Sequence, residues 1–160
     1  MGLLKAQFLT TAATRSRCID PRHFKRPESV LVVVHTQADV LLIKRADHEE
    51  FWQSVTGSLN WGESPVDAAR RELREETGLH GLYLKNTGIS RSYSILEQWR
   101  HRYPPNTCRN IEHVFYCSVD NRPDIELSPE EHTDMQWVAF DLACEIAFSW
   151  SNRLAIKSLN

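Results

Sequence analysis

The chain has 160 residues, of which 41% are hydrophobic and 25% charged, and its formal net charge at pH 7 is −2. This length and composition predict one domain with a sizeable hydrophobic core. The nearly balanced charge argues against a basic surface for nucleic-acid polymers and against electrostatic binding to membranes. The four cysteines have no CxxC spacing and no segment resembles a secretory signal, so we expect a cytoplasmic protein with reduced thiols.

The first 24 residues show no periodic apolar pattern, and they contain Arg15, Arg17 and Arg22 against a single acidic residue. This basic composition is compatible with a transit peptide. A short flexible tail, or an upstream start of the reading frame, is the preferred interpretation. We therefore predict an N-terminal extension over residues 1–24 and a folded domain over residues 25–160.

Three strands are predicted before the most informative part of the chain. Residues 29–34 form a β-branched run, which predicts a strand buried on both faces. A turn separates this run from residues 40–45, so the two strands are predicted to pair as a hairpin. Residues 51–57 predict the third strand. Lys25 and Lys44 stand at strand ends, where they are either solvated lysines or phosphate-binding residues.

Local signals define a helix over residues 65–77. Ser64 is a suitable N-cap, and Pro65 fits the first helical position because its missing N–H would have no partner there. Gly78 can adopt the left-handed conformation that ends a helix. The predicted helix therefore has three to four turns.

Three glutamates of this helix, Glu72, Glu75 and Glu76, lie beside its apolar stripe at about 100° per residue. The helix can bury the stripe and still present its carboxylates to a cleft. Carboxylates gathered in one place repel one another, but they suit a hard divalent cation, and Mg²⁺ prefers one or two of them plus substrate phosphates. Arg71 precedes Glu75 by one turn and can orient it. These residues predict metal-assisted hydrolysis of a phosphoanhydride.

The spacing of Gly57, Glu63 and residues 71–79 (Arg-Glu-Leu-Arg-Glu-Glu-Thr-Gly-Leu) resembles the complete signature of the Nudix hydrolases. This resemblance implies an α/β fold, an α/β/α sandwich with a central mixed sheet. It also implies hydrolysis of a small-molecule phosphoanhydride with Mg²⁺ or, alternatively, Mn²⁺. A surface helix rich in salt bridges would explain the charges but not the glycines and Glu63 at this spacing. A non-catalytic nucleotide-binding module is a weaker alternative, because such modules usually lose signature glutamates.

The Nudix resemblance also implies roles for individual glutamates. Glu72 and Glu76 are expected to hold the metal, and Glu75 and Glu131 to complete the cluster. Glu131 is the preferred additional glutamate after the signature, and Glu112 is the other candidate. Glu75 and Glu131 are also the leading candidates for the general base, which the sequence leaves unassigned.

Beyond the helix, residues 80–89 predict a strand that continues or bends through residues 91–96. Residues 99–109 form a basic loop with two prolines, which is either solvated or holds outer phosphates through residues such as Arg102. Residues 111–119 predict a central strand, and residues 135–138 another.

Two C-terminal helices complete the prediction. Helical periodicity extends over residues 140–147 and 151–159, and Ser151 is a plausible N-cap for the second helix. The chain shows no internal repeats, low-complexity segment or second domain. The sequence leaves the oligomeric state open.

Four blocks outside the signature are similar to the bacterial dihydroneopterin triphosphate pyrophosphatases, a group within the family. These blocks are residues 25–27, 51–58, 100–103 and 149–153. The similarity implies that the enzyme removes pyrophosphate from 7,8-dihydroneopterin triphosphate in folate biosynthesis and leaves the monophosphate. The alternative substrates are ordinary or oxidised (d)NTPs, cleaved in nucleotide-pool sanitation.

A pterin ring is flat and needs an apolar slot with hydrogen-bonding groups along its edge. We expect this slot to be lined by residues on three separate segments. They are Thr56, Tyr93, Ser94, Ile95, Leu96 and Ser149.

Overall fold

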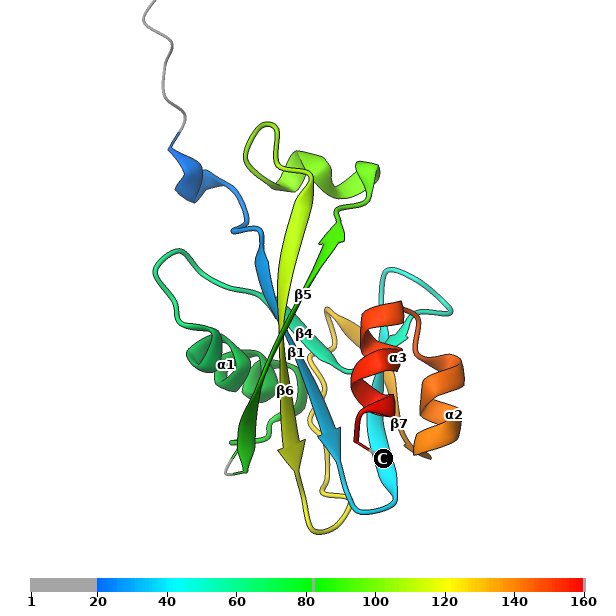
Figure 1. The fold of residues 1–160 in the computed structure, drawn as a ribbon. Helices are drawn as coiled ribbons and strands as arrows, with labels where there is room; N and C mark the ends of the chain where they lie inside the picture. Colours follow the sequence, from blue (N-terminus) through cyan, green and yellow to red (C-terminus); the bar gives the residue numbers. More distant parts are fainter. Residues whose placement is uncertain (1–19, 82, 160) are drawn as a thin grey trace, which may run out of the picture.

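The computed structural model describes residues 20–81 and 83–159, in which one mixed seven-stranded sheet is covered by helices on both faces (Figure 1). Helix α1 covers one face, and α2 and α3 cover the other, so the predicted α/β/α sandwich is confirmed. The strands are β1 Glu28–His35, β2 Asp39–Arg45, β3 Trp52–Gln53, β4 Val55–Ser58, β5 Leu84–Ser94, β6 Arg109–Ser118 and β7 His132–Ala139. The α-helices are α1 Pro65–Thr77, α2 Phe140–Ile146 and α3 Trp150–Lys157, and the 3₁₀ helices are η1 Pro21–His23 and η2 Glu97–Arg102.

Most of the expected N-terminal extension, residues 1–19, lies outside the described residues. Within the described ranges, no helix is long and apolar enough to cross a membrane.

The centre of the sheet is β1, which pairs with β6 in parallel along its whole length, from Glu28 opposite Ile111 to His35 opposite Ser118. Its other edge is shared by two strands. At the hairpin, β2 pairs with β1 through Val40, as predicted, whereas β4 pairs antiparallel with residues 29–32. The remaining pairs, β2 with β3 and β7 and β5 with β6, are antiparallel, so the sheet is mixed as expected.

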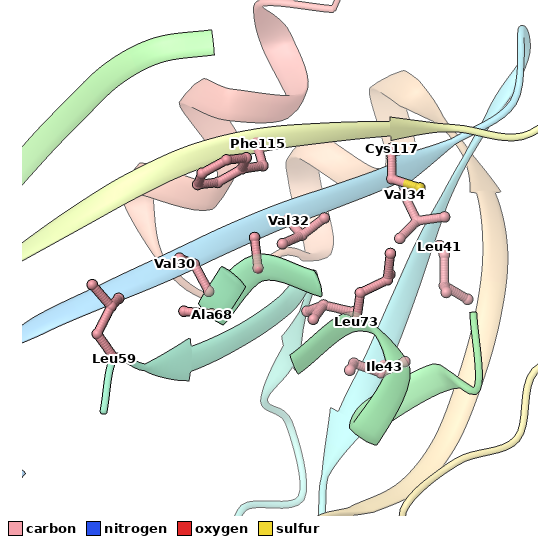
Figure 2. Packing of buried hydrophobic residues seen from close by; sticks show 12 residues of the cluster. Val30, Val32, Val34, Leu41, Ile43, Leu59, Ala68, Leu73, Phe115 and Cys117 are labelled. Carbon is pink, nitrogen blue, oxygen red and sulfur yellow. The ribbon is translucent and has the colours of Figure 1, made fainter. Parts of the chain in front are cut away.

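The core consists of two layers, because successive strand residues point to opposite faces of the sheet. Val30, Val32 and Val34 of β1 face α1 and pack with Leu73 and Phe115 (Figure 2). Leu31 and Val33 of β1 point to the other face and pack there with α2 and α3. The prediction of a first strand buried on both faces is therefore confirmed.

The predicted third strand is interrupted at Ser54, and this expectation needs correction. The Ser54 N–H donates to the Asn152 side-chain oxygen at 2.8 Å, and the Asn152 amide donates to the Ser54 hydroxyl at 2.8 Å. Both residues are buried. The Ser54 N–H is thus bonded to α3 and not to a neighbouring strand. Before Ser54 the chain pairs with β2 as β3, and after it the chain pairs with β1 as β4.

Other boundaries also differ from the sequence-based expectation. Ser149, not Ser151, caps α3, because the Ser149 hydroxyl accepts from the Asn152 N–H, and Ser151 is buried in the first turn. Strand β7 begins at His132, three residues earlier than expected, because it pairs with β2 as far as Arg45. Part of the basic loop forms η2.

Candidate active site

Helix α1 begins and ends at the residues that its caps predict. The Ser64 hydroxyl accepts from the Asp67 N–H, Pro65 occupies the first turn, and Gly78 has a φ of 73° and donates its N–H to the Arg74 carbonyl. Residues 68, 69, 72, 73, 76 and 77 are buried. The helix therefore directs Glu72 and Glu76 toward the sheet and leaves Glu75 exposed.

Arg71 joins three carboxylates of the signature. Its Nη1 donates to Glu72 Oε1 at 2.6 Å and to Glu75 Oε2 at 3.0 Å. Its Nε and Nη2 form a two-pronged pair with Glu63, each bond 2.9 Å long, and Nη2 also donates to the Ser58 carbonyl. The predicted contact between Arg71 and Glu75 is therefore present. The same arginine also holds Glu63 at one side of the carboxylate cluster.

The carboxylate of Glu72 lies directly against the backbone of Gly57 in β4. A Cβ atom at position 57 would overlap with Cδ and both carboxylate oxygens of Glu72. Only glycine therefore leaves room for this carboxylate at its observed place. The signature glycine and the signature glutamate form one packed unit.

Glu76 is 3% exposed and lies between β4 and β7. Its Oε2 accepts from the Thr56 N–H at 3.2 Å, and its Oε1 lies 3.4 Å from His132 Nε2. Ligand atoms of Glu76, Glu131 and His132 all lie within 4.8 Å of one another. Glu131 is exposed, so this cluster joins a buried carboxylate to an accessible one.

Burial makes the negative charges of these glutamates costly. It raises the pKa of Glu72 to about 7. The charges of Glu76 and Glu75 raise this pKa further, whereas the hydrogen bond and charge of Arg71 lower it. Burial also raises the pKa of Glu76, although His132 and the Thr56 N–H favour its charged form. A divalent cation would offset this cost, so the donor set fits an oxygen-coordinating metal ion.

Two adjoining cavities flank this cluster. The larger, of about 780 Å³, lies between the sheet, α3 and η2, and the smaller, of about 510 Å³, contains Glu72, Glu76, Glu131 and His132. The two cavities are continuous through a set of shared residues. They are Lys25, Arg45, Gln53, Thr56, Gly57, Ser58 and Arg102.

The cations that line both cavities, Lys25, Arg45 and Arg102, gather at the junction. Enclosure lowers the pKa of Lys25, and the neighbouring charges of Arg102 and Arg45 lower it further. A polyanion would relieve this repulsion. The junction is therefore suited to phosphate groups.

The NUDIX domain matches residues 25–157 of the chain. The chain belongs to the Nudix family. It is 37% identical over 140 residues to a protein of Escherichia coli K12 named dihydroneopterin triphosphate diphosphatase, covering 84% of this chain and 92% of the relative. A protein of Haemophilus influenzae with the same name is 38% identical, with 84% and 87% covered. The resemblance inferred from the sequence is therefore confirmed.

Solved structures agree with this assignment. The structure of the E. coli dihydroneopterin triphosphate pyrophosphohydrolase has a TM-score of 0.78 and 36% identity, covering 84% of this chain and 95% of that one. A NUDIX hydrolase structure from Listeria monocytogenes, at 21% identity, has a TM-score of 0.72 and shows the same fold.

Most of the expected substrate-binding residues of this Nudix chain line the larger cavity. They are Lys25, Thr56, Tyr93, Ser94, Ile95, Leu96, Arg102 and Ser149. Lys44 lines neither cavity, and its ammonium lies 6.0 Å from the ring centre of Trp52. Arg71 and Glu75 also line neither cavity, and Arg71 contacts the smaller one through its bond to Glu72.

Sequence reasoning missed two residues of the Nudix site, although each is next to a residue that it selected. Arg45 follows Lys44 at the end of β2, where the pairing with β7 shifts its register, and it lines both cavities. His132 follows Glu131 and approaches Glu76. Their proximity to selected residues was the available signal.

Glu112 was the alternative to Glu131 for the metal cluster, and the structure does not support that role. It lies on β6 among residues that face α3, and it lines the larger cavity. The group of residues whose ligand atoms could hold a metal ion contains Glu131.

Proposed function

We propose that this Nudix protein hydrolyses 7,8-dihydroneopterin triphosphate to dihydroneopterin monophosphate and pyrophosphate, with Mg²⁺ as its metal and Mn²⁺ as the alternative. One observation supports this most directly: a cavity large enough for a bicyclic ring is continuous with a cation-lined junction and a carboxylate cluster. The names of the E. coli and H. influenzae relatives support the same substrate.

In this proposal Glu72, Glu76 and Glu131 hold the metal, and Glu75 lies at the solvent edge of the set. A bound divalent cation would supply positive charge to the phosphate oxygens and make water more acidic. The protein itself contributes the buried position of Glu76, which the Thr56 N–H and His132 fix. Arg71 contributes the orientation of Glu72 and Glu75.

The reaction requires a water oxygen to form a bond to phosphorus while one anhydride P–O bond breaks. The leaving oxygen takes the electron pair, and the water proton passes to a carboxylate. Glu131 is better placed than Glu75 to accept this proton, because it lines the smaller cavity, whereas the Glu75 carboxylate is hydrogen-bonded to Arg71. Lys25, Arg45 and Arg102 would orient the triphosphate at the junction of the two cavities.

The experiment that tests this function compares kcat/KM for dihydroneopterin triphosphate with kcat/KM for a panel of dNTPs, including oxidised ones, in the presence of Mg²⁺. We expect the pterin substrate to be preferred by at least about tenfold. A higher kcat/KM for a dNTP would support nucleotide-pool sanitation instead. If none of the tested substrates yields pyrophosphate, the result would support a non-catalytic binding module.

The Glu76→Gln variant tests the metal site in the same assay. We expect a loss of metal-dependent turnover of about 100-fold or more, with the fold retained, because a neutral amide is a poor ligand for a hard cation. Normal turnover by this variant would show that Glu76 does not hold the metal.

A further inference from the structure

The larger cavity contains a buried carboxylate that the proposed hydrolysis does not use. Glu112 of β6 is 5% exposed and lines this cavity. Its Oε2 has no hydrogen-bond partner among the described residues. A buried acceptor without a partner is costly, so this atom indicates a ligand that would supply the missing hydrogen bond.

The neighbours of Glu112 are already engaged with other groups. The Asn110 amide donates to the Ser29 hydroxyl at 2.7 Å and to the Tyr93 hydroxyl at 3.0 Å. Arg91 donates to the Ser151 carbonyl at 3.1 Å. The polar groups around the carboxylate therefore stabilise the wall of the cavity and leave Oε2 for an incoming donor.

The sheet places Glu112 at a suitable distance from the carboxylate cluster. Glu112 is opposite Ser29 of β1, and Ser29 is opposite Ser58 of β4, so two strand spacings, about 10 Å, separate β6 from β4. Ser58 lines both cavities and follows Gly57, which contacts Glu72. A ring at Glu112 could thus extend its side chain and phosphates along β4 to the metal site.

We propose, on the basis of the function proposed above, that Glu112 recognises the 2-amino-4-oxopyrimidine edge of the substrate ring. This edge carries two adjacent donors, a ring N–H and an exocyclic amino group, and the two oxygens of one carboxylate can accept from both. The guanine ring shares this edge. Adenine and hypoxanthine lack one or both donors, so Glu112 would select against them.

The charges around Glu112 agree with this assignment. Burial raises the pKa of Glu112, while Ser151 and the charge of Arg91 oppose the rise. Two N–H donors from a ligand would favour the charged form in the same direction as Arg91.

The test compares the wild-type protein with Glu112→Gln, which preserves the shape but places an amide donor against the donors of the ring. Glu145→Gln, an exposed substitution on α2, is the matched control. We expect Glu112→Gln to raise KM for dihydroneopterin triphosphate by about tenfold or more while kcat changes by less than about threefold. Binding of the fluorescent ring compound neopterin, measured by titration without metal, should weaken by a similar factor. Glu145→Gln should change neither quantity.

A pair of nucleotides isolates the amino group. The wild-type protein should hydrolyse GTP with a higher kcat/KM than ITP, which differs only in lacking that group, and Glu112→Gln should abolish the preference. An unchanged GTP/ITP ratio together with an unchanged KM for the pterin would overturn the proposal. If Glu112→Gln does not fold, Glu112→Asp decides: the GTP/ITP ratio should fall by at least about threefold, and an unchanged ratio would overturn the proposal.

These outcomes distinguish this inference from the proposed function. If the wild-type protein does not hydrolyse dihydroneopterin triphosphate but shows a Glu112-dependent preference for GTP over ITP, the function is wrong and the ring contact is supported. If the wild-type protein hydrolyses the pterin substrate, and Glu112→Gln changes neither the KM for that substrate nor the GTP/ITP ratio, only the ring contact is wrong.

Discussion

Gly57 and Glu72 are in such close contact that a Cβ atom on the glycine would overlap with the carboxylate of the glutamate. Gly57 is not among the described residues with positive φ, so alanine would not strain the backbone there. The atoms that must move are the end of a flexible side chain. Gly57→Ala should therefore displace the Glu72 carboxylate, which we propose to hold the metal, at little cost in stability.

We expect Gly57→Ala to lower kcat/KM by about 100-fold and to raise the Mg²⁺ concentration needed for half-maximal activity. Its free energy of unfolding in the absence of metal should change by less than about 1 kcal/mol. Activity assays across a Mg²⁺ titration, together with urea denaturation, provide the measurement. Normal activity at ordinary Mg²⁺ concentrations would show that Glu72 is not needed in its observed position.

Arg71 provides a second test, because it holds three carboxylates in one geometry. Lysine keeps the charge but lacks the planar fork that bonds to Glu63, so Arg71→Lys should lower kcat by about tenfold or more. Arg70→Lys is the control, since Arg70 is exposed on the same helix. Equal kcat values for the two variants would mean that the positive charge alone is sufficient.

Glu131 and Glu130 are adjacent exposed glutamates, and only Glu131 belongs to the cluster with Glu76 and His132. If Glu131 holds the metal or accepts the water proton, Glu131→Gln should lower kcat by about 100-fold. Glu130→Gln should stay within about twofold of the wild type, since the two changes remove the same charge from neighbouring positions. A similar loss in both variants would indicate an effect of net charge.

The sequence predicted both ends of α1 because its signals are local. Ser64, Pro65 and Gly78 define the ends of the helix through bonds within three or four residues, as the structure shows. The Arg71–Glu75 contact follows from the same helical geometry. The break at Ser54 could not be predicted in this way, because its partner Asn152 is 98 residues away in the chain.

The site shows a second limit of sequence reasoning. Alternation along a strand indicates which residues share a face, but not which helix covers that face. Lys44 was therefore selected from the sequence, whereas the structure places its neighbour Arg45 at the phosphate junction. Glu112 was the alternative member of the metal cluster because the Nudix resemblance implies one more glutamate after the signature, but it faces the cavity beside α3.

The last prediction concerns pH. Because burial raises the pKa of Glu72 from 4.5 to about 7, the folded metal-free protein binds more protons than the unfolded chain between these values. The contribution of Glu72 to the free energy of unfolding should therefore be highest below pH 4.5 and should be lost as the pH rises through 7. The loss amounts to at most about 3.5 kcal/mol, given about 1.4 kcal/mol per pKa unit.

Urea denaturation in EDTA at pH 5, 6, 7 and 8 would measure this effect in the wild type and in Glu72→Gln. The glutamine cannot ionise, so the wild type should lose stability relative to the variant over this range. Added Mg²⁺ should restore stability to the wild type more strongly at pH 8 than at pH 6, because the metal competes with the proton for the carboxylate. Parallel profiles for the two metal-free proteins would show that Glu72 is already ionised at pH 5, and that Arg71 outweighs the cost of burial.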